Sequence, residues 1–256
     1  YCFHSVDGFS KINSYTGNGS ADGPIVETGF EPAFLMLKRT DNAGSWAIID
    51  NKRTPTNPRN LELFANLNDA DNTFAAVDFL SNGFQIINTS NTYKASGDTF
   101  IYMAFAADPD EVAPTLASSF NIETWRGNGS GLSVTGLGFE PGFIWAKSTT
   151  AANSHSMFDT VRGINKELNS NSTDAQGSLD DGVLSFDSDG WTMGDRANLT
   201  QNNEDFVGWA WKADDNEPTI FGEPAIAVYK FEDNANDVTG TYNGTASNVT
   251  YSSSGY

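Results

Sequence analysis

The sequence contains a single cysteine, Cys2, among its 256 residues. This excludes an internal disulfide and any zinc site built from several cysteines. Basic residues are also few, because 14 lysines and arginines stand against 33 acidic residues and give a net charge of −19. That charge argues against nucleic acid as a partner, since a phosphate backbone is bound through an electropositive surface. No apolar run approaches the roughly 18–20 residues that a membrane-spanning helix needs, so we expect no membrane insertion.

The residues that are plentiful indicate an all-β protein. Aromatic residues make up 12% of the chain, and there are 24 glycines, whereas charged residues make up only 18%. Aromatic side chains favour half-buried pleated surfaces, and glycine favours the turns between strands. The composition therefore predicts strands joined by many turns.

One motif occurs twice, about 110 residues apart. Tyr15-Thr-Gly-Asn-Gly-Ser20 is followed by Gly29-Phe-Glu-Pro32 and an apolar strand, and Trp125-Arg-Gly-Asn-Gly-Ser130 is followed by Gly138-Phe-Glu-Pro141 and a similar strand. Later motifs keep the same order: an Asn-Gly hairpin at Gly83 corresponds to an Asp-Gly hairpin at Gly190. A repeat of this length predicts two copies of one structural unit.

The repeat predicts five segments. We expect the last strand of a preceding repeat and a linker (1–10), a first β-sandwich repeat (11–109), a linker (110–120), a second β-sandwich repeat (121–215), and a linker with the start of a third, lectin-like β domain (216–256). The two sandwiches should have jelly-roll or lectin-like character. Residues 165–182, which are polar and lack apolar periodicity, should form a long surface loop.

The first residues should take part in assembly. Tyr1-Cys-Phe-His-Ser-Val6 resembles the strand that closes each repeat, so we expect Tyr1, Phe3 and Val6 to lie on an orphan strand. An unpaired strand needs hydrogen-bonding partners. A neighbouring unit, in the same chain or in another copy, should supply them.

The repeat resembles a domain family of bacteriophage tail-fibre and virion structural proteins. The resemblance rests on the Tyr/Trp-x-Gly-Asn-Gly motif, the Gly-Phe-x-Pro turn, His155-Ser-Met-Phe-Asp-Thr-Val-Arg-Gly163, and the closing Trp209-Ala-Trp-Lys212 strand. The first repeat departs from the pattern at Trp46 and Asn51-Lys52. The resemblance implies a virion structural protein with no enzymatic activity, located in a tail fibre or a related extracellular filament.

A second, shorter resemblance concerns the C-terminal part. Val228-Tyr-Lys-Phe-Glu-Asp-Asn-Ala-Asn-Asp237 is similar to the first strand and turn of laminin-G-like, concanavalin A-type lectin domains. Such domains often hold calcium near turns of this kind, so Asp233 and Asp237 are candidate calcium ligands, against the simpler interpretation of an acidic surface. No other cofactor is expected.

Several residues invite catalytic interpretations that the repeat argues against. His155 lies near serines and Asp159, but its counterpart in the first repeat is Trp46, which cannot act as a base, so we expect a packing position. Glu31 and Glu140 fall at duplicated turns, where solvated acids are common. The pairs Asp50/Arg53 and Asp159/Arg162 recur at the same spacing, and we expect an ion pair that ties a loop to a strand in each repeat.

Other residues offer binding or modification sites. Five tryptophans are candidates for sugar stacking (Trp125, Trp145, Trp191, Trp209 and Trp211), and those in strand patterns should be core. Seven Asn-x-Ser/Thr sequons occur, most of them by chance in a chain of this composition, and they matter only if the source glycosylates this protein: Asn18, Asn88, Asn128, Asn171, Asn198, Asn243 and Asn248.

The sequence therefore favours a structural repeat protein that assembles with neighbouring repeats or other copies of itself. The alternative is a carbohydrate-binding adhesin that recognises host surface glycans through exposed aromatic residues. A polysaccharide depolymerase is a third hypothesis, but it requires a carboxylate pair that the repeat does not duplicate, and no unique pair stands out.

Overall fold

The computed structural model describes residues 2–20, 22–87, 91–106 and 119–212, together with the strand pair β18 (Thr219–Ile220) and β19 (Glu223–Pro224). Residues 1–213 form one compact unit and residues 214–256 a second. We call residues 2–106 the first half and residues 119–212 the second half of the larger unit. The strands are antiparallel throughout, and the prediction of an all-β protein is confirmed.

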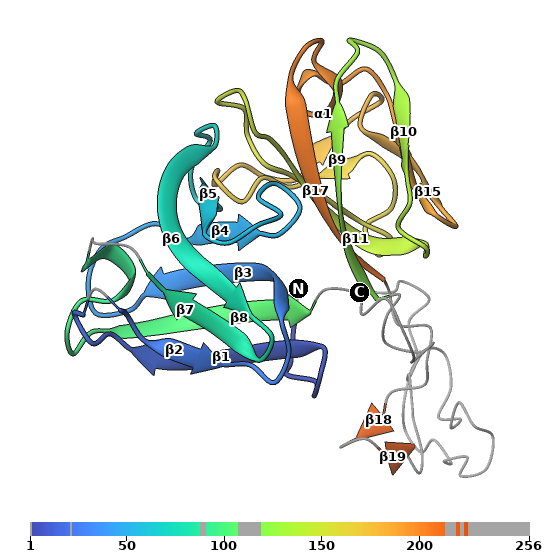
Figure 1. Ribbon diagram of the computed structural model, residues 1–256. Helices are drawn as coiled ribbons and strands as arrows, with labels where there is room; N and C mark the ends of the chain where they lie inside the picture. The colour runs from blue at the N-terminus through green and yellow to red at the C-terminus, as the bar shows by residue number, and fades with distance from the viewer. Residues whose placement is uncertain are drawn as a thin grey trace, which may run out of the picture. The chain divides into compact units, whose positions relative to one another are not determined.

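The first half is a single eight-stranded sheet that folds over its own core. Strands β1, β8 and β3 lie side by side, and the full order is β1-β8-β3-β4-β5-β6-β7-β2 (Figure 1). Side chains from both ends of this order share one core, for example Tyr15, Leu37 and Phe100 with Val26 and Phe84. Its elements are β1 (Ser10–Thr16), β2 (Ile25–Glu27), β3 (Pro32–Arg39), β4 (Ala47–Asp50), β5 (Arg59–Phe64), β6 (Asn72–Leu80), β7 (Gly83–Ile86), the 3₁₀ turn η1 (Asn91–Tyr93) and β8 (Thr99–Ala106).

The second half encloses its core between separate sheets of four and three strands. The orders are β12-β11-β17-β9 and β10-β16-β15. Trp191, Ile144 and Phe158 lie in this core. The elements are β9 (Phe120–Arg126), β10 (Leu132–Thr135), β11 (Pro141–Ser148), β12 (Ser156–Asp159), β13 (Lys166–Glu167), β14 (Gly177–Ser178), β15 (Val183–Asp187), β16 (Gly190–Met193), α1 (Ala197–Thr200) and β17 (Asp205–Lys212).

The two halves share their strand order and register. The sheet β4-β3-β8-β1 corresponds to β12-β11-β17-β9, and β2-β7-β6 corresponds to β10-β16-β15. Phe34 pairs with Asp50 and Phe105 in the first half, as Phe143 pairs with Asp159 and Trp211 in the second. The halves differ in β5, which joins the two sheets in the first half.

The Gly-Asn-Gly motif has the same structural role in both halves. A Cβ on Gly17 would lie 2.1 Å from the carbonyl oxygen of Ala95, and a Cβ on Gly127 would lie 2.1 Å from that of Gln201. Only glycine allows this approach of one backbone to another. The motif therefore holds the end of the first strand of each half against the segment that precedes its last strand.

The predicted strand at the N-terminus differs from the structure. Tyr1 lies outside the described residues, residues 2–5 form no strand, and Val6 makes only an isolated bridge with Ser10. The chain turns back at Gly8, and the hydroxyl of Ser10 donates a hydrogen bond to the carbonyl of His4. This tight turn keeps the segment near β1 instead of continuing a ladder, so the strand prediction was wrong for the described residues.

Other predictions can be compared directly. Both predicted hairpins form, with Leu80 paired to Gly83 and Asp187 paired to Gly190. The expected loop at 165–182 contains the short pair β13 and β14 within otherwise irregular structure. Most of the predicted 110–120 linker and of the expected lectin-like start lies outside the described residues.

Candidate assembly interface

The outer faces of strands β4-β3-β8-β1 in the first half and of the sheet β12-β11-β17-β9 in the second are apolar, and they pack against each other. Phe34 and Phe105 of the first half contact Phe120, Trp209 and Trp211 of the second, with ring centroids 5.2–5.9 Å apart in each contacting pair. These side chains belong to a core cluster shared by both halves. Because the apolar cluster crosses from one half to the other, the halves are joined by a buried hydrophobic contact.

A buried polar contact lies within this apolar one. The indole Nε1–H of Trp209 donates to Oδ2 of Asp50 at 3.1 Å, and both residues are at most 1% exposed. The guanidinium of Arg53 lies 5.8 Å from the Trp209 ring centroid, and its Nε donates to the same Asp50 oxygen at 2.7 Å. Burial by itself lowers the pKa of Arg53, but the charges of Asp50 and Asp71 outweigh burial and raise it. The ion pair predicted for Asp50 and Arg53 is therefore confirmed, and it also receives a side chain from the other half.

The second recurring pair also forms. Nε of Arg162 donates to Oδ2 of Asp159 at 2.6 Å, and the Asp159 carboxylate accepts the backbone N–H of Arg162 as well. Arg162 is less buried than Arg53, since its side chain is 20% exposed against 3%. Each pair fixes the turn that follows β4 or β12.

His155 is a buried member of the same contact. Its Nδ1 accepts a hydrogen bond from the Trp145 indole at 2.8 Å, and its Nε2 lies 3.0 Å from the carbonyl oxygen of Phe64 in the first half. These partners require the neutral tautomer with the proton on Nε2. Burial, with a smaller effect from the charge of Lys147, lowers the pKa of His155 to about 3. The ring therefore serves packing and hydrogen bonding, and its partners are neither of the neighbouring serines nor Asp159.

Loop residues add hydrogen bonds between the halves. The backbone N–H of Asp71 donates to the carbonyl of Thr149 at 2.8 Å, and the hydroxyl of Ser170 donates to the carbonyl of Ala65. Lys52 and Glu123 form an ion pair at 3.2 Å at the edge of the contact. Ser170 belongs to the long polar loop, so this loop helps to hold the halves together.

The contact between the halves uses different surfaces of the two equivalent units. We define the receiving surface by Phe34, Asp50, Arg53, Leu63 and Phe105, and the inserting surface by Ile122, Trp145, His155, Val207 and Trp209. Lys52 and Glu123 form an ion pair across the contact, and their counterparts are Val161 and Asn13. In a symmetric contact these counterparts would also contact each other. They do not, because Val161 is 95% exposed. The contact is therefore heterologous, in the sense that the two units meet through non-identical surfaces.

Phe3, one of the predicted assembly residues, lies at this contact. Its ring centroid is 5.7 Å from that of Phe105 and 5.6 Å from that of Trp211. Val6 instead contacts its own turn through Ser10. Whether these residues meet another copy stays a prediction.

The tryptophans considered for sugar stacking are mostly core. Trp145, Trp191, Trp209 and Trp211 are at most 8% exposed, and Trp125 stacks on Phe206. Sequence reasoning missed Trp46 as an exposed aromatic side chain, although it is 36% exposed. The sequence signal for an exposed Trp46 was its position directly before β4, a strand whose outer face is apolar in both halves.

Acidic residues beside the Asp-Gly hairpin of the second half accept hydrogen bonds within the fold. Asp189 accepts the backbone N–H of Gly138 at 2.7 Å, and Asp187 accepts the hydroxyl of Thr192 at 2.8 Å. Glu31 and Glu140 are exposed turn residues. The described residues include no group of three or more His, Cys, Asp or Glu placed to hold a metal ion. Asp233 and Asp237 lie outside the described part of the chain.

Among the sequons, Asn18 and Asn128 are exposed but support their own turns. The side-chain oxygen of Asn18 accepts the N–H of Ser20, and that of Asn128 accepts the N–H of Ser130. Asn171 accepts the backbone N–H of His155, and both it and Asn198 are half-buried. Asn88, Asn243 and Asn248 lie outside the described residues.

No helix of the described residues has the length and apolar character required to cross a membrane. Comparison with curated proteins and with solved structures gave no match. A family model, described as a domain of unknown function (DUF7483), matches residues 1–109 and 116–254. The gap between the two matched stretches falls within the predicted linker. Because the match covers most of the sequence, the chain belongs to the DUF7483 family.

Proposed function

We propose that this chain is a structural segment of a phage tail fibre, or of a related virion or extracellular filament, built from similar units packed in series. The observation that carries this proposal is the heterologous contact between the two equivalent halves, in which Trp209 of one unit binds the Asp50/Arg53 pair of the other. Units that contact their neighbours through non-identical surfaces form closed rings or extended series, and tandem units in one chain favour the extended series. The motif resemblance supports the same assignment.

The chemistry of the described residues fits a structural role. The groups that first suggest catalysis include His155 and Asp159, and both hold the fold: His155 joins the two halves, and Asp159 fixes a turn. The surface charge of −19 over the whole chain favours solubility of the isolated chain.

The test is to image the native particle or filament that contains this chain by cryo-electron microscopy. We expect density for these units stacked end to end, with each new unit meeting the previous one as the second half meets the first. Isolated single units, each holding an ordered sugar or calcium ion, would contradict the proposal and favour the adhesin.

One observation favours carbohydrate binding as a second candidate function. Trp46, Asn13 and Ser14 line one pocket on the first half, which offers an aromatic surface beside polar side chains. Aromatic residues of this kind can stack on sugars. Titration with a glycan library, followed by tryptophan fluorescence and compared with Trp46→Ala, would detect such binding.

A further inference from the structure

The inserting surface is buried in the second half, but its counterpart is exposed in the first half. Ile122, Val207 and His155 are 3%, 0% and 0% exposed, whereas their counterparts Ile12, Ile101 and Trp46 are 38%, 38% and 36% exposed. Register fixes these equivalences, because Ile12 pairs with Met103 as Ile122 pairs with Trp209. An apolar surface that one unit buries against its neighbour therefore lies open on the equivalent unit.

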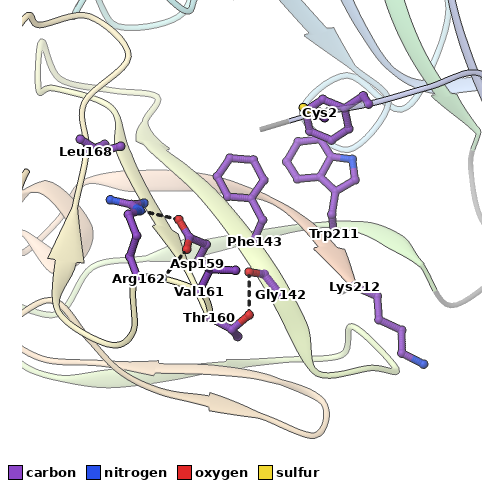
Figure 2. Close-up of a pocket in the computed structure, with 11 residues that line it drawn as sticks. Cys2, Gly142, Phe143, Asp159, Thr160, Val161, Arg162, Leu168, Trp211 and Lys212 are labelled. Carbon is purple, nitrogen blue, oxygen red and sulfur yellow. Dashed lines mark hydrogen bonds and ion pairs between the residues drawn. The ribbon is translucent and has the colours of Figure 1, made fainter. Parts of the chain in front are cut away.

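The second half carries the counterpart of the receiving surface. Phe143, Asp159, Arg162, Leu168 and Trp211 line a pocket of about 560 Å³, and they correspond to Phe34, Asp50, Arg53, Leu63 and Phe105 (Figure 2). Leu168 bridges to Met157 as Leu63 pairs with Ile48, which places it in the same position. Figure 2 shows Cys2 beside Trp211 and the Asp159–Arg162 pair on another side of the pocket.

We propose that a second copy of this chain packs its exposed Ile12, Trp46 and Ile101 surface against the pocket lined by Phe143, Val161 and Leu168, and so repeats between chains much of the contact that joins the two halves. This inference rests on the proposed structural function and names the partner and the surfaces. The occupant follows from the internal contact, because the same strand positions already form that contact within one chain. Both surfaces belong to every copy, so the association continues beyond a pair.

The contact between chains lacks two polar interactions of the internal one. Met103 stands where Trp209 stands in the second half, and its side chain has no N–H to donate to a carboxylate. Asn13 and Val161 stand where Glu123 and Lys52 form an ion pair. The contact between chains therefore rests on apolar burial, and we expect it to be weaker than the internal contact and dependent on protein concentration.

Sedimentation velocity on the full chain over a range of concentrations tests the apolar part of this contact. We expect the wild-type chain to form species larger than a dimer as the concentration rises, and Ile12→Glu to weaken this association by at least about tenfold, because a charge would be buried in the contact. Ile101→Glu on the neighbouring strand is a second variant. Leu184→Glu is the matched control, since Leu184 is 39% exposed on β15, away from both surfaces, and should leave association unchanged.

A gain of association tests the proposed register. Asn13→Glu combined with Val161→Lys rebuilds between chains the ion pair that Lys52 and Glu123 form within the chain. We expect a severalfold stronger association at low salt that fades at high salt, because exposed charges are screened. Asn13→Lys combined with Val161→Lys places like charges together and should weaken association at low salt. Both positions are exposed, so neither variant should affect folding.

The failure of this inference can be distinguished from the failure of the proposed function. Assemblies that form equally well with Ile12→Glu and Ile101→Glu would overturn the proposed surfaces while leaving a structural function in place. A wild-type chain that stays monomeric, or that stops at a dimer, would also overturn the inference. Glycan binding that depends on Trp46 in a monomeric chain would overturn the proposed function as well.

Discussion

Trp209 donates its indole N–H to the carboxylate of Asp50, which lies 159 positions earlier in the chain. The two residues belong to equivalent units but occupy different positions within them. The same carboxylate also accepts the backbone N–H of Arg53, so one buried group fixes a turn and joins two units. The contact between the halves is thus built on a feature that each unit already needs for its own fold.

Removing this carboxylate should be costly. Asp50→Ala leaves the guanidinium of Arg53, whose side chain is 3% exposed, with Asp71 as its remaining ion-pair partner. Breaking a buried pair in this way costs about 3–5 kcal/mol of unfolding free energy. Asp159→Ala is the matched variant in the second half, and it should cost less because Arg162 is more exposed. Urea denaturation of both variants measures the difference; equal losses would contradict the special position of Asp50.

His155 should make stability depend on pH. The pKa of its ring is about 3 in the fold, against 6.5 for an ordinary histidine. The unfolded chain therefore binds more protons between these values, so stability falls as pH decreases through this window, by up to about 1.4 kcal/mol per pH unit. Protonation of Nδ1 would also break the hydrogen bond from Trp145.

The variant His155→Gln tests this effect. A glutamine can accept from Trp145 and donate to Phe64, so it keeps the hydrogen bonds without a titratable ring. We expect a shallower fall in stability between pH 6.5 and 3 in thermal unfolding than for the wild-type chain. His4→Gln changes the other, exposed histidine and should leave the profile as it is. A profile for His155→Gln that follows the wild-type curve would count against a buried neutral ring.

The Gly-Asn-Gly motif should tolerate no side chain at its first glycine. In Gly127→Ala the new Cβ would meet the backbone oxygen of Gln201 at 2.1 Å. The backbone has to shift, and overpacking of this kind costs about 1–3 kcal/mol or more. Gly44→Ala is the control, because no atom lies within 4 Å of its Cβ position, and it should unfold like the wild-type chain. Equal melting temperatures for the two variants would refute this role.

The sequence predicts much of each unit, because most motifs occur in two copies and each copy supports the interpretation of the other. The Asn-Gly and Asp-Gly hairpins, the strands that begin at Pro32 and Pro141, and the Asp50/Arg53 pair all follow from local signals. The predicted strand at Val6 failed for a local reason as well: hydrogen bonds of Ser5 and Ser10 turn the segment back on β1.

The contact between the halves could not be predicted in the same way. In the sequence, Trp209 and His155 have the pattern of ordinary core positions. Only the fold shows that they lie at the contact between the two halves. One signal was present: Phe100-Ile-Tyr-Met-Ala-Phe105 is apolar at nearly every position, which indicates a strand covered on both faces. The inner face belongs to its own unit, whereas Ile101 on the outer face is 38% exposed.

The most direct test of the contact between the halves is a double-mutant cycle on Asp50→Ala and Trp209→Phe, measured by urea denaturation. Trp209→Phe keeps an aromatic ring but removes the indole N–H whose hydrogen bond Asp50 accepts. If the hydrogen bond joins the halves as described, the two single variants will together lose more unfolding free energy than the double variant loses. The difference, which is the coupling energy, should be about 0.5–3 kcal/mol. Losses that add to within about 0.5 kcal/mol would show that the two residues do not interact, and would contradict the contact on which the assembly proposal is built.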